Sequence, residues 1–204
     1  PANAFVTKDE LEVEQACYPL DLYFCESCAH VQLLDVVDPG VLFENYVYVS
    51  GTSPVFVKYL GDQARSVASR FGLGAGDLAL EIGSNDGTLL KAYQGCGLSV
   101  LGIDPARDIA ARASAGGIET WPEFFGPALA DRVVRARGKV KVVAANNVFA
   151  HADDLGAIAD GIRVLLADDG VFVFEVSYLL DVLEKTLFDT IYHEHLSYHS
   201  VAPL

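Results

Sequence analysis

The hydrophobic pattern of the chain becomes regular after about residue 77. Short continuous apolar runs then recur at residues 78–82, 100–103, 140–144 and 171–176, with a weaker run at 118–121. Such runs are typical of strands that are buried on both faces of a parallel sheet. Stretches with helical spacing separate them, near residues 88–94, 106–115, 127–137 and 155–166. This alternation predicts an α/β fold with a doubly wound parallel sheet, which binds ligands beyond the carboxyl ends of its strands.

The N-terminal part of the chain has a different pattern, with short mixed runs. Residues 20–24 alternate like a strand, and residues 31–34 form a second short apolar run. Ser53 and Pro54 are placed to start a helix, and residues 55–71 have helical apolar spacing. We therefore expect a small β-rich appendage over residues 1–50 and an α/β domain over residues 51–204.

Composition excludes several classes of protein. The chain of 204 residues is 51% hydrophobic, which is enough for a core, and no apolar run is long enough to span a bilayer. Its first residues show no basic region followed by an apolar core, so we expect a cytoplasmic location. The formal net charge of -14 argues against nucleic acid or an anionic membrane as the partner. A small-molecule partner is compatible with this charge.

An acid and a glycine-rich loop follow the first predicted strand of the sheet, over Glu81-Ile-Gly-Ser-Asn-Asp-Gly87. Gly83 and Gly87 let the backbone turn sharply and approach a ligand. Asp104 ends the next apolar run, where a carboxylate can accept both hydroxyls of a ribose. These features predict a nucleotide-cofactor cradle. An ordinary tight turn of an α/β protein is the alternative, because such short motifs also occur by chance.

The chemistry of this loop favours a cationic cofactor. A dinucleotide fingerprint is G-x-G-x-x-G, whereas this loop has Gly83-x-Asn85-x-Gly87, with Glu81 before it and Asp86 inside it. Two carboxylates would repel a pyrophosphate but tolerate a cation. S-adenosylmethionine joins adenosine to a sulfonium cation with an amino-acid tail, so we predict it as the cofactor. An oxidoreductase on a related sheet is the disfavoured alternative.

A possible metal site lies near the N-terminus. Cys25-Glu-Ser-Cys28 is the one close pair among the four cysteines. In a reducing compartment this spacing favours metal over a disulfide. A closed zinc site needs four ligands, and Cys17 and His30 are the nearest residues that could complete it. Two ordinary thiols on a turn are the alternative.

The catalytic candidate is the segment Tyr192-His-Glu-His195, in a stretch that holds three of the five histidines. Histidine titrates near neutral pH, glutamate can orient an imidazole, and tyrosine can donate to a developing oxyanion. General acid–base chemistry therefore fits this segment. The metalloprotease motif His-Glu-x-x-His is absent, because Ser197 occupies the place of its second histidine. A metal held by His195 and His199, or a solvated loop, are weaker alternatives.

Four segments in order resemble a known family. They are Leu42-Phe-Glu-Asn-Tyr-Val-Tyr-Val-Ser-Gly-Thr-Ser53, Leu80-Glu-Ile-Gly-Ser-Asn-Asp-Gly-Thr-Leu89, Ala145-Asn-Asn-Val-Phe-Ala-His151 and Phe188-Asp-Thr-Ile-Tyr-His-Glu-His-Leu-Ser-Tyr198. Nearly end to end, the chain resembles the S-adenosylmethionine-dependent C-methyltransferases of deoxysugar biosynthesis, the sugar 3-C-methyltransferase type. The resemblance implies a class I, Rossmann-like methyltransferase fold. It also implies methylation of the carbon next to the ketone of a nucleotide-linked 4-keto-deoxysugar, typically dTDP-linked.

The resemblance also implies roles for individual residues. The proton at the sugar carbon would be taken by His195, with Glu194 beside it and Tyr192 lining the reacting centre. Substrate-binding residues would be Tyr46, Tyr48, Asn147 and His151. Cofactor-binding residues would be Glu81, Gly83, Asn85, Gly87 and Asp104. Zinc-binding residues of an N-terminal domain would be Cys25 and Cys28.

The chain departs from the family pattern at both ends. The family has two C-x-x-C pairs, and the first lies upstream of the position that matches Pro1. The family also continues well past the histidine segment. We therefore expect an internal fragment, with a remnant of the zinc-binding domain over residues 1–50 and a methyltransferase domain incomplete at its C-terminus. Cofactor binding is expected to survive, with weak or absent turnover. A non-catalytic cofactor-binding fragment and a methyltransferase acting on another small molecule are the alternatives.

Overall fold

The computed structural model describes residues 5–203, and the chain divides into two compact units. One unit, called here the sheet unit, contains Val47–Asn146 and Asp154–Phe174. The other, called the terminal unit, contains Pro1–Tyr46, Asn147–Asp153 and Glu175–Leu204. Each unit is therefore assembled from segments that are distant in the sequence.

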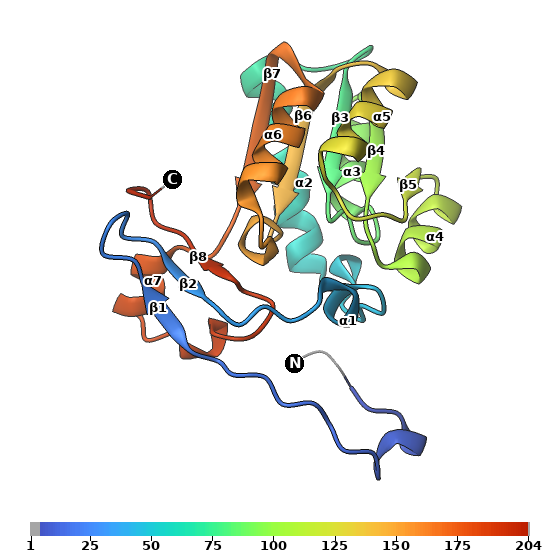
Figure 1. Ribbon diagram of the computed structural model, residues 1–204. Coiled ribbons are helices and arrows are strands. Elements are labelled where there is room, and N and C mark those ends of the chain that lie inside the picture. Colours follow the sequence, from blue (N-terminus) through green and yellow to red (C-terminus); the bar gives the residue numbers. More distant parts are fainter. Residues whose placement is uncertain (1–4, 204) are drawn as a thin grey trace. The chain divides into compact units, whose positions relative to one another are not determined.

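Five strands form the sheet of the sheet unit, in the order β5-β4-β3-β6-β7 (Figure 1). Their bounds are β3 (Leu78–Ile82), β4 (Ser99–Ile103), β5 (Thr120–Trp121), β6 (Val140–Asn146) and β7 (Leu166–Glu175). Parallel pairing places Leu80 of β3 opposite Leu101 of β4 and Val143 of β6. All five residues of β3 are buried, which explains its continuous apolar run.

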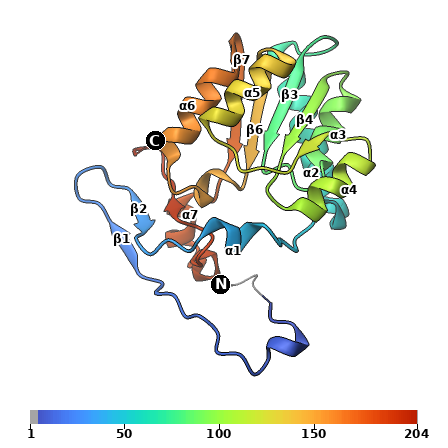
Figure 2. The same cartoon turned by 45° about the vertical axis from the view of Figure 1, so that its right-hand side comes forward.

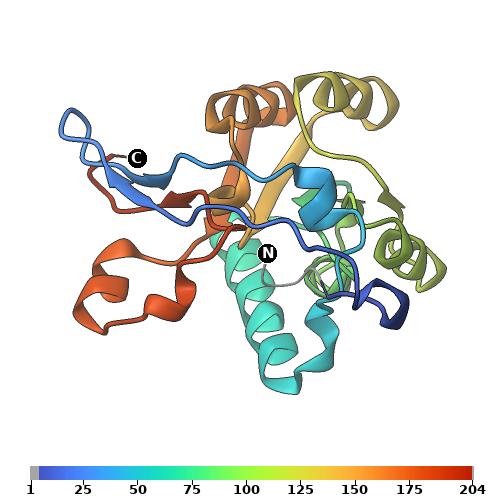
Figure 3. The same ribbon diagram turned by 60° about the horizontal axis from the view of Figure 1, so that its bottom comes forward.

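Helices cover both faces of this sheet, so the predicted doubly wound α/β fold is confirmed. Their bounds are α2 (Pro54–Phe71), α3 (Thr88–Gly95), α4 (Arg107–Ala115), α5 (Pro127–Arg137) and α6 (Leu155–Leu165). Figure 2 shows α5 and α6 in front of the strands, and Figure 3 shows α2 on the opposite side of β6. The start of α2 follows from its sequence, because the Ser53 side chain accepts a hydrogen bond from the Phe56 N–H at 3.3 Å.

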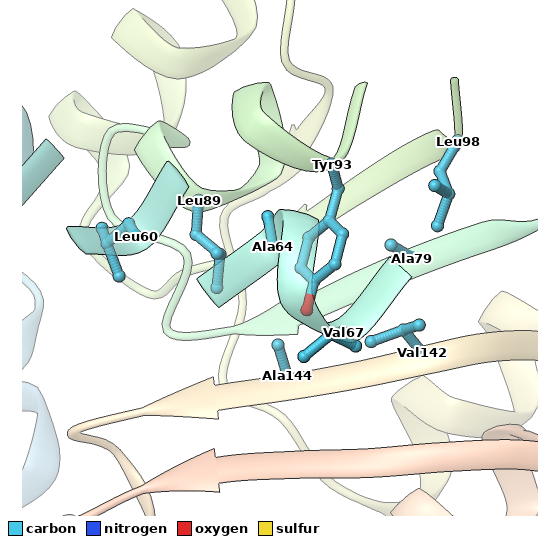
Figure 4. Close-up of a cluster of buried hydrophobic side chains, with 9 residues drawn as sticks. All are labelled: Leu60, Ala64, Val67, Ala79, Leu89, Tyr93, Leu98, Val142 and Ala144. Carbon is cyan, nitrogen blue, oxygen red and sulfur yellow. The ribbon is translucent and has the colours of Figure 1, made fainter. Parts of the chain in front are cut away.

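The core between the sheet and α2 and α3 is a cluster of nine buried residues (Figure 4). They are Leu60, Ala64, Val67, Ala79, Leu89, Tyr93, Leu98, Val142 and Ala144. Because side chains alternate along a strand, Ala79 of β3 faces this cluster and Leu80 faces the other side. Glu81 therefore lies on the same side of β3 as Tyr93. Figure 4 also shows β6 and β7 running in the same direction.

The terminal unit contains a small antiparallel sheet in the order β1-β2-β8. Its strands are β1 (Leu22–Phe24), β2 (Val31–Leu33) and β8 (Ser197–Tyr198), and its α-helices are α1 (Pro39–Phe43) and α7 (Leu179–Glu184). Its 3-10 helices are η1 (Lys8–Glu10), η3 (Phe149–His151) and η4 (Phe188–Thr190). A further 3-10 helix, η2 (Ser50–Thr52), belongs to the sheet unit. Leu196 and Tyr198 share a buried cluster with Val31 and Leu33.

The structure adds to the sequence prediction in two places. The expected strand at residues 171–176 begins at Leu166, directly after α6. The compact unit that contains most of the expected appendage also takes in residues 147–153 and the segment that starts at residue 175, because β8 pairs with β2 and both contribute apolar side chains to one cluster. The domain assignment itself stays a prediction. Within the described residues, no helix is both long enough and apolar enough to cross a membrane.

A buried phenol allows a test of the core. Tyr93 is fully buried, and no residue of the described chain hydrogen-bonds to its hydroxyl. Removal of an unpaired buried hydroxyl is nearly neutral or stabilising. We therefore expect Tyr93→Phe to leave the free energy of unfolding unchanged, or to raise it by about 1 kcal/mol, in urea denaturation. Leu89→Ala in the same cluster is the control and should lower it by about 2–5 kcal/mol. A loss of more than about 1 kcal/mol in Tyr93→Phe would contradict this account of the core.

Candidate active site

The glycine-rich loop after β3 has the backbone of a ligand cradle. Gly83, Asn85 and Gly87 have positive φ angles of 65°, 50° and 77°. The N–H of Gly83 donates to the carbonyl of Ile103 on β4 at 2.7 Å, which holds the loop against the end of the sheet. A Cβ at position 87 would lie 2.8 Å from Cγ2 of Ile118. Glycine is therefore required at position 87 by its φ angle and by close packing.

Asp104 lies at the end of β4 with its carboxylate buried. One oxygen accepts from the backbone N–H of Asn85 at 2.7 Å, and the other accepts from the N–H of Ala106 at 2.9 Å. Burial raises the pKa of this carboxyl, and the two backbone hydrogen bonds oppose that rise. A carboxylate has about four acceptor positions, and these contacts use two of them. Asp104 therefore keeps acceptor capacity for the two hydroxyls of a ribose.

Glu81 is the second buried acid of the cradle. Burial raises its pKa well above the ordinary value, and the negative charges of Asp104 and Asp86 add to the shift. Its Oε2 has no hydrogen-bond partner within the part of the chain that the structure describes. An unpaired buried carboxyl oxygen is costly unless a donor or a cation meets it.

These residues fit the predicted cofactor. Glu81 offers a buried oxygen to a cationic group, Asp104 offers acceptors to a ribose, and the positive φ angles of Gly83 and Gly87 turn the loop sharply beside them. The side chain of Asn85 hydrogen-bonds to backbone groups of Tyr48 and Ser50. The backbone N–H of Asn85 donates to Asp104. Asn85 thus connects the cradle to the segment that precedes α2.

In the terminal unit, the imidazole of His195 is fixed at both ring nitrogens. Nδ1 lies 2.8 Å from the carbonyl oxygen of Thr190, and Nε2 lies 3.0 Å from the hydroxyl of Tyr192. A carbonyl oxygen only accepts, so Nδ1 carries the proton and Nε2 accepts from the phenol. Burial lowers the pKa of His195, against the opposing effect of the Thr190 carbonyl. The result is a neutral imidazole whose basic nitrogen is held by a tyrosine.

Aromatic rings pack around His195. The ring of His151 lies with its centroid 5.1 Å from that of His195 and stacks on Phe43 at 5.5 Å. Burial, and next the proximity of His195, lower the pKa of His151 to about 3. Burial, and next the charge of Glu194, raise the pKa of Tyr192 to about 12. At neutral pH both imidazoles are therefore uncharged and the phenol keeps its proton.

Glu194 is the fully buried carboxyl of the same unit. Its side chain is 0% exposed, and its Oε2 accepts a hydrogen bond from the hydroxyl of Tyr46 at 3.3 Å. Tyr46 follows α1, so this bond joins segments 148 residues apart in the sequence. The arrangement brings two residues with predicted roles, Tyr46 and Glu194, into direct contact.

Asn147 occupies a special backbone position at the start of the η3 segment. Its φ angle is 54°, a region that asparagine tolerates better than most residues. Its N–H donates to the carbonyl of Glu175 at 2.7 Å, and its side-chain amide donates to the carboxylate of Glu175 at 3.4 Å. Asn147 thus helps to place the turn that ends with His151.

The cysteine pair forms a tight turn in the terminal unit. The N–H of Cys25 donates to the carbonyl of His30 at 2.8 Å, and the N–H of Ala29 donates to the carbonyl of Cys25 at 2.8 Å. Backbone N–H groups of Cys28 and next Ser27 lower the pKa of the Cys25 thiol. However, no three potential metal ligands cluster among residues 5–203. The described residues do not complete a four-ligand zinc site, and zinc binding by Cys25 and Cys28 stays a prediction.

The predicted site residues therefore form two groups. The sheet unit holds Tyr48, Glu81, Gly83, Asn85, Gly87 and Asp104, and the terminal unit holds Tyr46, Asn147, His151, Tyr192, Glu194 and His195. Sequence reasoning missed Thr190, which acts through its carbonyl and leaves no side-chain signal. It also missed Phe43 as the stacking partner of His151, although Phe43 lies in the first of the four segments that indicated the family.

Comparisons with known proteins identify the class. Residues 56–203 match the model of a methyltransferase domain, and residues 1–43 match a model described as "Putative zinc binding domain". The structure is similar to that of YcgJ from Bacillus subtilis, with a TM-score of 0.53 and 14% identity, over 69% of this chain and 63% of that one. It is also similar to ChlM, the magnesium protoporphyrin IX methyltransferase of Synechocystis PCC 6803 with bound SAH, with a TM-score of 0.51 and 15% identity, over 72% and 68%. The expected class I fold is confirmed.

The chain belongs to the methyltransferase family, because the family's domain model matches most of its length. A more specific relative is the C-methyltransferase NovU of Streptomyces niveus, which is 36% identical over 190 residues. The match covers 93% of this chain and 45% of NovU, so the chain spans less than half of that relative. The methyltransferase family expected from the four segments is thereby confirmed.

The pKa of His151 predicts how stability depends on pH. The folded protein holds this pKa at about 3, against 6.5 for an ordinary histidine, so the unfolded chain binds more protons between these values. The contribution of His151 to stability is full above pH 6.5 and is lost as the pH falls through this window. Between pH 6.5 and 5 the loss is at most about 2 kcal/mol.

His151→Gln removes this titration, so its unfolding free energy should fall less over the same pH interval than that of the wild type. Urea denaturation at the two pH values measures the difference. Equal pH dependence in both proteins would show that His151 titrates normally in the folded state.

Proposed function

We propose that this protein is an S-adenosylmethionine-dependent C-methyltransferase that acts on a nucleotide-linked 4-keto-deoxysugar, in which His195 removes the proton next to the ketone. The observation that carries the proposal is the His195 geometry, with Nδ1–H held by Thr190 and Nε2 facing Tyr192. A carbon next to a ketone becomes a nucleophile only after it loses a proton. Transfer to carbon thus needs a neutral, oriented base, which transfer to many O and N acceptors does not.

His195 would act through Nε2. When substrate displaces the Tyr192 hydroxyl from this nitrogen, Nε2 takes the proton from carbon, and the electrons of the C–H bond form the enolate. The pKa of Tyr192 is raised to about 12, so its phenol stays protonated and can donate a hydrogen bond to the enolate oxygen. The pKa of His195 is lowered, which keeps Nε2 unprotonated at neutral pH.

Residues of the cradle would hold the methyl donor. S-adenosylmethionine supplies a methyl group activated by its sulfonium. Asp104 would accept hydrogen bonds from the ribose hydroxyls, and Glu81 would face the cationic end. The loop between Gly83 and Gly87 would lie beside the cofactor. The match to a methyltransferase domain and the fold shared with a protein solved with SAH support this assignment.

Carbon as the methyl acceptor and a sugar as the substrate are supported by different observations. The name of NovU, a C-methyltransferase, supports carbon as the acceptor. The nucleotide-linked ketosugar, a place in deoxysugar biosynthesis and a cytoplasmic location come from the resemblance of the four sequence segments and from composition. In this proposal Tyr46, Tyr48, Asn147 and His151 contact the sugar nucleotide.

Proton removal can be measured without methyl transfer. In D₂O, with a dTDP-linked 4-keto-deoxysugar and no methyl donor, the protein is expected to exchange the proton next to the ketone, as followed by NMR. His195→Gln keeps hydrogen-bonding atoms but removes the base, so exchange should slow by about 100-fold or more. In the wild type, the exchange rate should fall on the acid side with an apparent pKa below 6.5.

The Tyr192→Phe variant separates the base from its partner. Loss of the phenol should slow exchange by about 10- to 100-fold through the weaker stabilisation of the enolate, while Nε2 remains available. Circular dichroism and thermal unfolding serve as folding controls for both variants. Wild-type exchange rates in a folded His195→Gln protein would rule out His195 as the base.

A further inference from the structure

In the sheet unit, side chains of the glycine-rich loop hydrogen-bond to the backbone of a segment that precedes α2. The segment Tyr48–Thr52, called here the strap, precedes α2 and includes the turn η2 (Ser50–Thr52). The amide oxygen of Asn85 accepts from the N–H of Ser50 at 2.9 Å, and its Nδ2 donates to the carbonyl of Tyr48 at 2.9 Å. The Asn85 amide thus pairs with the strap as a peptide group would.

Asp86 makes the second connection. One carboxylate oxygen accepts from the N–H of Gly51 at 2.9 Å. The other accepts from the hydroxyl of Thr88 at 2.7 Å and from the N–H of Thr88 at 3.2 Å, at the start of α3. Because the second oxygen is held by Thr88, the first cannot move freely away from the strap.

Gly51 shows how closely the strap approaches the loop. A Cβ at this position would lie 2.4 Å from the Asp86 carboxylate oxygen and 3.1 Å from the Thr88 hydroxyl oxygen. Only glycine therefore fits while Asp86 keeps its bonds to Thr88. The strap and the loop are complementary in shape as well as in hydrogen bonds.

Asn85 also links the strap to the cofactor acid. Its backbone N–H donates to Asp104 at 2.7 Å, while its side chain is hydrogen-bonded to the strap. The carboxylate of Asp104 and the backbone of Tyr48 are thus bound by the same residue. A ligand that orders the loop around Asp104 would order the strap with it.

We infer that Asn85 and Asp86 are positioning residues that dock the strap on the glycine-rich loop, so that the strap retains the methyl donor in its cradle. The inference rests on the proposed function, because it assumes that the cradle binds S-adenosylmethionine or its product. It gives these two residues a task beyond cofactor contact: neither side chain needs to touch the cofactor to control its affinity.

The first test uses Gly51→Ala, which forces the strap away from Asp86 without changing any group of the cradle. Its matched control is Gly74→Ala, because a Cβ at position 74 meets nothing within 4 Å. Two hydrogen bonds or more are lost when the strap lifts, so S-adenosylhomocysteine should bind about tenfold more weakly to Gly51→Ala in calorimetric titration. Gly74→Ala should bind as the wild type does.

Hydrogen exchange measures the docking of the strap directly and separates it from a general loss of stability. In Gly51→Ala, a peptide spanning the strap should exchange about tenfold faster, whereas a peptide spanning β3 should keep its protection. Asn85→Asp gives an independent variant, since aspartate tolerates the same φ angle but cannot donate to the Tyr48 carbonyl. It should reproduce both effects, and Asn85→Gly, which lacks the side chain altogether, should do the same.

The outcomes are distinct. Weaker binding together with faster strap exchange supports the inference. Wild-type affinity in a variant whose strap exchanges faster overturns the inference and leaves the proposed function intact. Unchanged strap exchange in Gly51→Ala also overturns it, since the docking contact is then absent. If the folded wild-type chain binds no S-adenosylhomocysteine, the proposed function fails and the inference fails with it.

Discussion

The buried carboxylate of Asp104 is the constraint on which the sheet unit depends. It lies at the carboxyl end of β4 and takes one backbone N–H from the glycine-rich loop and one from the segment that leads into α4. A buried carboxylate must find donors, so its position fixes both neighbouring turns. The positive φ angles of Gly83 and Gly87 and the pairing of Asn85 with the strap all surround this anchor. The remaining acceptor positions of Asp104 are what a ribose would use.

A different balance governs the terminal unit, where burial keeps groups neutral. The pKa values of His151 and His195 are lowered and that of Tyr192 is raised, in each case chiefly by burial. Neutral imidazoles and a protonated phenol are suited to moving a proton between carbon and nitrogen, because no charge has to be neutralised first. In the proposed function, the acids of the sheet unit would serve a cation and a ribose, and the terminal unit would supply a neutral base for methyl transfer to carbon.

The sequence predicted most of the sheet unit, because its signals are local. Continuous apolar runs identified β3 and β6, and helical spacing predicted the stretch near residues 127–137 where α5 is observed. Pairings between distant segments gave no local signal. The two-residue strand β8 pairs with β2 across more than 160 residues, and only tertiary packing defines it. The candidate site shows the same division. The residue types and their spacing indicated His195 and Asp104. Thr190 contacts His195 through its backbone carbonyl, which every residue type has, so its sequence position gave no signal.

The account depends most directly on the assignment of Asp104 as the acid that holds the methyl donor. Calorimetric titration with S-adenosylhomocysteine should show saturable binding to the wild type and to His195→Gln. Asp104→Asn should bind at least about 30-fold more weakly, because it loses the charge and replaces one acceptor oxygen with a donor. Thermal unfolding establishes that each variant is folded. Equal affinity of a folded Asp104→Asn for S-adenosylhomocysteine would contradict the account.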